Sequence, residues 1–142
     1  MALAYSISDY VKLGSGNELP ESAIEELGPY FPGYDLSKIR IYEDLPWYVK
    51  DFSQVDAAAF TFGDKIYFAK GQYDPNSPAG QSLIGHEIVH STQFADSGKI
   101  GFSIIYIGSY VKNLINGSSN AYLNIPFEQE AYRMQFRIYN DL

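Results

Sequence analysis

The chain has 142 residues, of which 46% are hydrophobic, and its formal net charge is −7 at pH 7. A chain of this length and apolar content can bury one sizeable core, which favours one domain over two. The absence of cysteine excludes disulfide scaffolds and cysteine-based zinc sites, and the acidic balance without any basic run argues against nucleic acid as a partner.

The amino terminus, MALAYSISDYVKLGSG, has no basic start, no long apolar stretch and no small-residue cleavage site, so it does not resemble a secretory signal. The most apolar stretch elsewhere, GFSIIYIGSYVKNLI, is interrupted by polar residues and is shorter than the ~20 apolar residues that cross a bilayer. We therefore expect no membrane span and a cytoplasmic location by default, with export by a non-classical route as the alternative.

The glycine-containing stretch GSGN at residues 14–17 favours a flexible joint. We therefore expect residues 1–18 to form an accessory segment and residues 19–142 to form a single domain. One hypothesis for the accessory segment is a propeptide that lies across the functional site.

The first half of the domain predicts a short helix, a strand and a hairpin. Pro20 starts a helix that the Gly28-Pro29 pair ends, and the alternating pattern of SKIRIYED predicts a half-buried strand. A second helix is expected to begin near Pro46. Aromatic and β-branched runs on either side of a glycine loop predict strands at about 58–62 and 66–69.

The second half predicts three helices. The Ser77-Pro78 pair caps a helix that is expected to run to about Ala95, with Gly98 as its stop. Another helix is predicted over 102–115, and a last one from Pro126 almost to the end. This order indicates an α+β fold without the strand–helix alternation of a parallel sheet.

The only two histidines, His86 and His90, stand four residues apart on the first of these helices. Residues at this spacing lie on one face of a helix, so both imidazoles can bind the same metal ion. Glu87 lies beside them and can reach a water held by the metal, which is the position of a general base. Gly85 either allows another element to approach closely or is a tolerated helical glycine.

A tetrahedral zinc site with an open position needs a third protein ligand, which must be a carboxylate here because no cysteine or other histidine exists. The last helix supplies Glu128 and Glu130. Glu130 shares a charged stripe with Arg133 and Arg137, whereas Glu128 lies at the edge of the apolar face. We therefore predict Glu128 as the ligand and Glu130 as a surface residue.

The segments GHEIVHSTQ and NIPFEQEAYR together resemble the gluzincins, the zinc peptidases with two helical histidines and a downstream glutamate. Over residues 19–140 the chain is more closely similar to a small metallopeptidase-like domain associated with bacterial extracellular contractile injection systems. The resemblance implies a zincin-like fold, in which a small sheet packs on the motif helix and the last helix carries the glutamate ligand. It also implies Zn²⁺ as cofactor, a peptide or protein substrate and an injection-system or toxin-related partner.

In the broader group the third ligand opens a Glu-x-x-Ala-Asp sequence, which corresponds here to residues 128–131 followed by Tyr132. Tyr132 therefore replaces an aspartate that supports a ligand histidine, which implies weaker metal binding. An oxyanion on the substrate also needs a second electrophile besides the metal. Tyr122 is the first candidate for that role and Arg133 the second.

Two classes of function remain open from the sequence. The first is a zinc endopeptidase that hydrolyses peptide bonds, in which one of the hairpin strands, 58–62 or 66–68, offers its edge to an extended peptide. The second is a catalytically weak or inactive module of a secretion or injection system, in which the peptidase fold is a scaffold for interaction or cargo loading.

Overall fold

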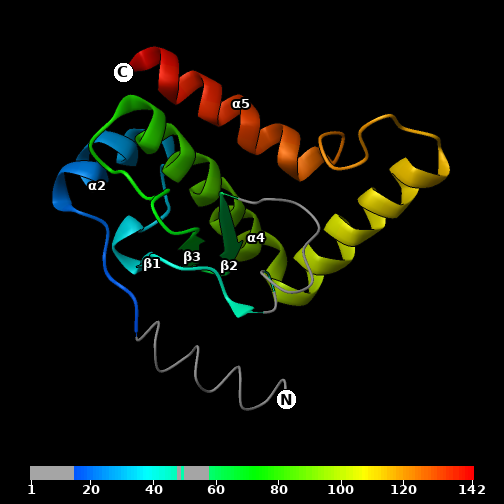
Figure 1. The fold of residues 1–142 in the computed structure, drawn as a ribbon, viewed down its shortest axis with the longest axis horizontal. Coiled ribbons are helices and arrows are strands. Elements are labelled where there is room, and N and C mark those ends of the chain that lie inside the picture. The colour runs from blue at the N-terminus through cyan, green and yellow to red at the C-terminus, as the bar shows by residue number, and fades with distance from the viewer. Residues whose placement is uncertain (1–14, 48, 50–57) are drawn as a thin grey trace.

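A three-stranded sheet packs against one long helix, and a second helix runs along that long helix on another side (Figure 1). The computed structural model describes residues 15–47, 49 and 58–142. Most of the predicted helix near Pro46 and most of the accessory segment lie outside the described residues, and Trp47 and Val49, at the start of that helix, are helical. The elements are α2 (Glu21–Leu27), the 3-10 helices η1 (Gly28–Tyr30) and η2 (Leu36–Lys38), β1 (Arg40–Tyr42), β2 (Ala59–Phe62), β3 (Lys65–Phe68), α4 (Pro78–Ile115) and α5 (Pro126–Asp141). This is an α+β fold, as the sequence predicts.

The sheet has the order β1-β3-β2, with β2 and β3 forming the predicted antiparallel hairpin. Gly63 opens the turn with a φ of 66°, a conformation that glycine adopts without steric cost. β1 pairs with β3 in parallel, so that Ile41 lies opposite Ile66. The sheet is therefore mixed, and β2 forms an edge that no other described strand pairs with.

The core lies between the sheet, α2, the first half of α4 and the inner face of α5. Its fully buried side chains are mainly isoleucine, leucine and phenylalanine, and each of these contributes roughly 1.5–3 kcal/mol when it leaves water. They include Leu27, Ile39, Ile41, Ile66, Phe68, Ile84, Ile88 and Ile138. The core therefore fixes α4 and α5 relative to the sheet, and these three elements carry the residues discussed below.

Helix α4 begins as the sequence predicts, because the Ser77 side chain accepts a hydrogen bond from the Gly80 amide and Pro78 is the first helical residue. The helix is interrupted at Gly98, whose φ of 73° and ψ of 164° are not helical. Two helices therefore meet at Gly98, in agreement with the predicted stop and restart. We call residues 78–97 the motif segment and residues 99–115 the arm.

The arm presents its most apolar side to solvent. Ile100, Ile104, Ile107 and Ile115 are each more than 60% exposed, whereas Phe102 is buried against the rest of the molecule. Among the described residues, no helix has both the length and the apolar character needed to cross a membrane.

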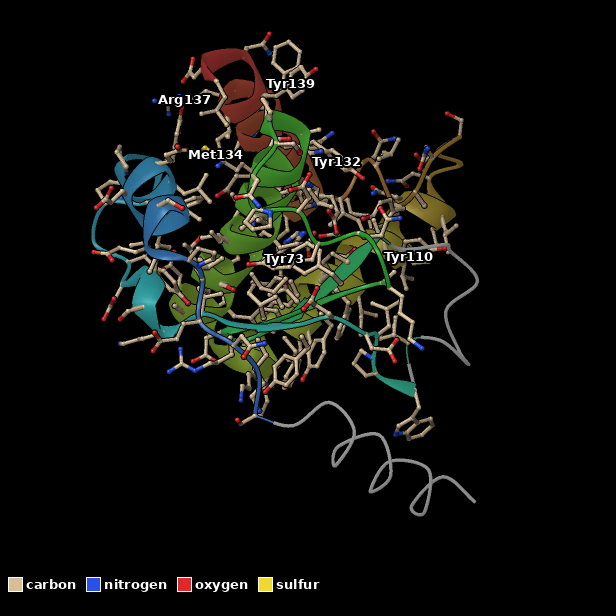
Figure 2. All side chains as sticks on the ribbon, turned by 60° about the vertical axis from the view of Figure 1, so that its left-hand side comes forward. Tyr73, Tyr110, Tyr132, Met134, Arg137 and Tyr139 are labelled. Carbon is tan, nitrogen blue, oxygen red and sulfur yellow. The ribbon has the colours of Figure 1, made fainter. Side chains whose placement is uncertain are left out.

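Helix α5 places its apolar face on the core and its charged residues, except Glu128, outside. Ala131 and Ile138 are buried, and Met134 packs against the core cluster. Figure 2 shows Arg137 on the side of α5 near α2, where its guanidinium lies 5.0 Å from the centre of the Tyr30 ring. Tyr139, in contrast, is more than half exposed.

Gly85 lies where α5 packs closely on the motif segment. A Cβ atom at this position would lie 2.3 Å from Cδ1 of Ile138, which is fully buried. Of the two hypotheses for Gly85, the structure therefore supports close approach of another element.

This contact predicts non-additive effects of substitution at Gly85 and Ile138. Ile138→Val should cost about 0.5–1.5 kcal/mol of unfolding free energy in the wild-type protein. In Gly85→Ala protein it should cost much less, because it removes the methyl group that the new Cβ overlaps. Urea unfolding of the four proteins of this cycle measures the coupling, and strictly additive free energies would contradict the contact.

Candidate metal centre

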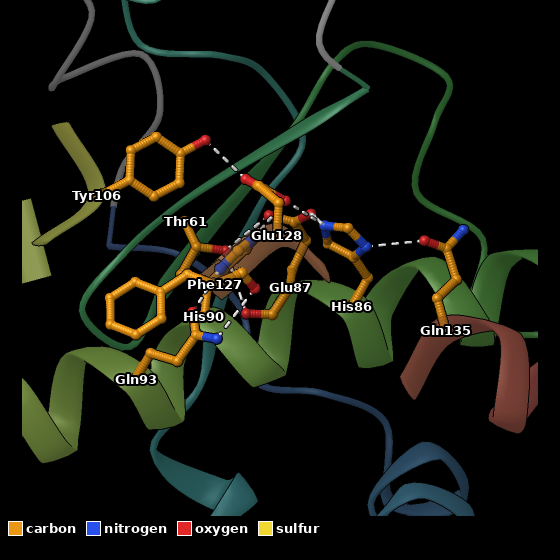
Figure 3. Close-up of polar contacts among 9 residues, drawn as sticks. All are labelled: Thr61, His86, Glu87, His90, Gln93, Tyr106, Phe127, Glu128 and Gln135. Atoms are coloured by element: carbon orange, nitrogen blue, oxygen red, sulfur yellow. Dashed lines mark hydrogen bonds and ion pairs between the residues drawn. The ribbon is translucent and has the colours of Figure 1, made fainter. Parts of the chain in front are cut away.

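His86, His90 and Glu128 meet in the interior, where α5 crosses the motif segment (Figure 3). The Nε2 atoms of both histidines lie 3.1 Å from Oε1 of Glu128. Each of the three residues is at most 6% exposed. Glu128 therefore lies beside the histidines, as predicted for a ligand, whereas Glu130 is exposed on the surface of α5. The buried cluster can hold a metal ion.

The other ring nitrogen of each histidine faces a glutamine side chain. Nδ1 of His86 lies 2.8 Å from Oε1 of Gln135, and Nδ1 of His90 lies 2.8 Å from Oε1 of Gln93. An amide oxygen can only accept a hydrogen bond, so each Nδ1 carries the donated proton. In the neutral imidazoles, Nε2 is then left with its lone pair directed at Glu128.

The orientation of the Gln93 amide is fixed independently. Its nitrogen donates to the backbone carbonyl of Phe127 at 3.1 Å, and a carbonyl cannot accept from an amide oxygen. The oxygen of the same amide must therefore face His90. Gln93 stands three positions after His90 on the same helix, so this spacing could have identified it in the sequence.

The pKa values of Glu128 and His90 are both shifted in the direction that favours positive charge between the two side chains. Burial alone raises the pKa of Glu128, but contacts with His86 and His90 outweigh it and hold that pKa well below its usual range. Burial alone lowers the pKa of His90, but Glu128 outweighs it and raises that pKa. A cation between the ring nitrogens and the carboxylate, either protons or a metal ion, satisfies all three groups.

Tyr106, on the arm, binds the second oxygen of the same carboxylate. Its hydroxyl donates to Oε2 of Glu128 at 2.7 Å, so only Oε1 faces the histidines. Phe102 stacks on Phe94, Tyr106 and Phe127 and so holds the arm against α5. The sequence analysis missed Tyr106, because its contact with Glu128 depends on the change of direction at Gly98.

Glu87 lies beside the three-residue cluster and not within it. Its Oε1 accepts a hydrogen bond of 2.8 Å from the Thr61 hydroxyl on β2, and its Oε2 lies 3.7 Å from Nε2 of His86. Glu87 is 5% exposed, so its carboxylate is held in a fixed place close to the histidines. Thr61 was not identified from the sequence, since only the packing of β2 on α4 brings it to Glu87.

Tyr122 and Tyr132 line the same region. Burial, the nearby charge of Glu128 and the neighbouring Tyr106 and Tyr132 raise the pKa of Tyr122. The Tyr132 ring contacts His86 edge-on, with 4.5 Å between the ring centres. Tyr132 therefore packs on His86, while Gln135, one turn further along α5, supplies the hydrogen bond that an aspartate at position 132 would have been expected to supply. Arg133, the other candidate electrophile, is exposed.

Comparison with protein families gives one match, the eCIS core domain, where eCIS denotes the extracellular contractile injection system. The match covers residues 18–98, which include His86, Glu87 and His90 and end before Tyr106 and Glu128. Searches of curated proteins and of solved structures find no significant match. Because the matched segment spans more than half of the 142 residues, the chain belongs to the eCIS core domain family.

Proposed function

We propose that this protein is a zinc-dependent metallopeptidase, with His86, His90 and Glu128 as the metal ligands and Glu87 as the general base. The observation that carries the proposal is the convergence of two imidazole Nε2 atoms and one carboxylate oxygen in a buried place. Their remaining polar atoms already have partners, so these three donors are left for a cation.

The donor set fits zinc. Two histidine nitrogens and one glutamate oxygen are a ligand set that catalytic zinc sites use, and it leaves one position for water or substrate. The cluster has the nitrogen donors that Mg²⁺ and Ca²⁺ sites lack. A bound zinc ion would supply a Lewis acid for the scissile carbonyl and lower the pKa of the attacking water.

The protein's own residues would perform the proton transfers. Glu87 takes a proton from the attacking water and passes it to the nitrogen of the leaving amine. The Thr61 hydrogen bond keeps the carboxylate of Glu87 in one orientation for both transfers. Tyr122 remains our candidate for stabilising the oxyanion, since Tyr106 already donates its proton to Glu128.

The edge of β2 offers a place for substrate. Thr61, in the middle of β2, touches Glu87, so the backbone of this strand runs past the general base. An extended peptide that adds to this edge through backbone hydrogen bonds would pass the same place.

The alternative function is a catalytically weak or inactive module that interacts with other components of an injection system or serves as its cargo. Two observations favour it: the chain belongs to the eCIS core domain family, and the arm exposes several large isoleucines. Exposed apolar side chains in such a group are typical of surfaces that bind another protein.

Zinc content should distinguish variants of the proposed ligands from a matched variant of a surface residue. We expect close to one zinc ion per chain in protein purified without chelator or a histidine tag, measured by elemental analysis. His86→Ala and Glu128→Gln should lose most of this zinc, because each removes one of three ligands. Glu130→Gln, the same change on an exposed residue of α5, should retain it.

Zinc should also stabilise the fold, by about 2.7 kcal/mol at a free concentration one hundred times the dissociation constant. Chelator should therefore lower the melting temperature of wild-type protein and leave that of Glu128→Gln unchanged. Wild-type protein that takes up no zinc, even after zinc is added back, would contradict the proposed site.

Peptide hydrolysis tests the role of Glu87. Glu87→Gln should abolish cleavage of a peptide library, because an amide cannot act as a general base. Its zinc content should stay normal, because the three proposed ligands are unchanged. Glu130→Gln again serves as the control for the same chemical change. Mass spectrometry of the peptide products gives the rate and the bond that is cut.

Cleavage that survives Glu87→Gln at the wild-type rate would overturn the mechanism. Normal zinc with no cleavage by the wild-type protein, together with an injection-system phenotype that Glu87→Gln leaves intact, would favour the interaction module.

A further inference from the structure

Among the described residues, Gln93 is the one side chain that forms hydrogen bonds with both a ligand histidine and the backbone beside the ligand glutamate (Figure 3). Its Oε1 lies 2.8 Å from Nδ1 of His90. Its Nε2 donates to the carbonyl of Phe127, the residue directly before Glu128, at 3.1 Å. The side chain is 5% exposed, so water does not readily replace either contact.

The two contacts act on different properties of the cluster. The contact with His90 places the proton on Nδ1 and leaves Nε2 as the free donor atom. The contact with Phe127 fixes the first turn of α5 against the motif segment, and the ring of Phe127 also stacks on Phe102. The backbone from which the Glu128 side chain extends is therefore held in place.

We infer that Gln93 is a positioning residue that prepares His90 and Glu128 together for the metal, an inference that rests on the metal centre of the proposed function. Gln135 differs from it in having a single contact of this kind, with His86. Loss of Gln93 thus disturbs two of the three ligands, and loss of Gln135 disturbs one. Hydrogen-bond partners of metal ligands typically change metal affinity by about 10–100-fold when they are removed.

Zinc affinity, measured by competition with a chromogenic chelator, tests the inference. Gln93→Met keeps the length of the side chain and removes both polar atoms, and it should weaken zinc binding by about 10–100-fold. Gln135→Met should weaken it less. Gln129→Met makes the same change on an exposed residue next to Glu128 and should leave the affinity unchanged.

A merely structural role of Gln93 gives a different result. The melting temperature of metal-free Gln93→Met would then fall while its zinc affinity stayed at the wild-type value, and this outcome would overturn the inference. Equal losses in Gln93→Met and Gln129→Met would overturn it as well.

Imidazole ¹⁵N spectra of zinc-loaded wild-type protein keep the test decisive if Gln93→Met does not fold. They should show His90 bound to the metal through Nε2 with a proton on Nδ1, and binding through Nδ1 would overturn the inference. Absence of zinc from the wild-type protein would remove both this inference and the proposed function. Normal wild-type binding with unchanged affinity in folded Gln93→Met would remove the inference alone.

Discussion

Three electron-pair donors gather in the interior within 4.8 Å of one another, and positive charge between them, from protons or a metal ion, relieves their mutual repulsion. Nε2 of His86 and of His90 both face one oxygen of Glu128 at 3.1 Å. Burial makes the repulsion between these donors stronger than it would be in water, because the surroundings screen charge poorly. The structure surrounding the cluster can be understood as the set of contacts that keep these donors together.

The change of direction at Gly98 allows one continuous stretch of chain to contribute to the cluster twice. The motif segment presents both histidines, and the arm contacts the first turn of α5, where Tyr106 binds the second oxygen of Glu128. The aromatic side chains of the arm that pack inward are those next to the cluster, whereas its isoleucines stay outside. The position of the arm is thus coupled to the carboxylate, and a partner that bound the isoleucines would act close to the site.

Local sequence patterns predicted the parts of the molecule that depend on local geometry. The spacing of His86 and His90, the cap at Ser77 and the stop at Gly98 each follow from helix geometry over a few residues, and the structure has them. Thr61 and Gln135 could not be found in this way, because they reach Glu87 and His86 from 26 and 49 residues away in the chain. Such contacts depend on how strands and helices pack, which helical or strand periodicity does not encode.

The use of amides to hold the histidines has a consequence for proton transfer. A carboxylate next to Nδ1 could share or take the ring proton, but the oxygens of Gln93 and Gln135 can only accept a hydrogen bond. The ring protons therefore stay on the histidines, and each Nε2 keeps the character of a neutral ligand. Glu128 has both oxygens engaged, one by the histidines and one by Tyr106. Of the two buried carboxylates, Glu87 is therefore the one that we propose as the proton carrier, and the hydroxyl of Thr61 holds it in one orientation.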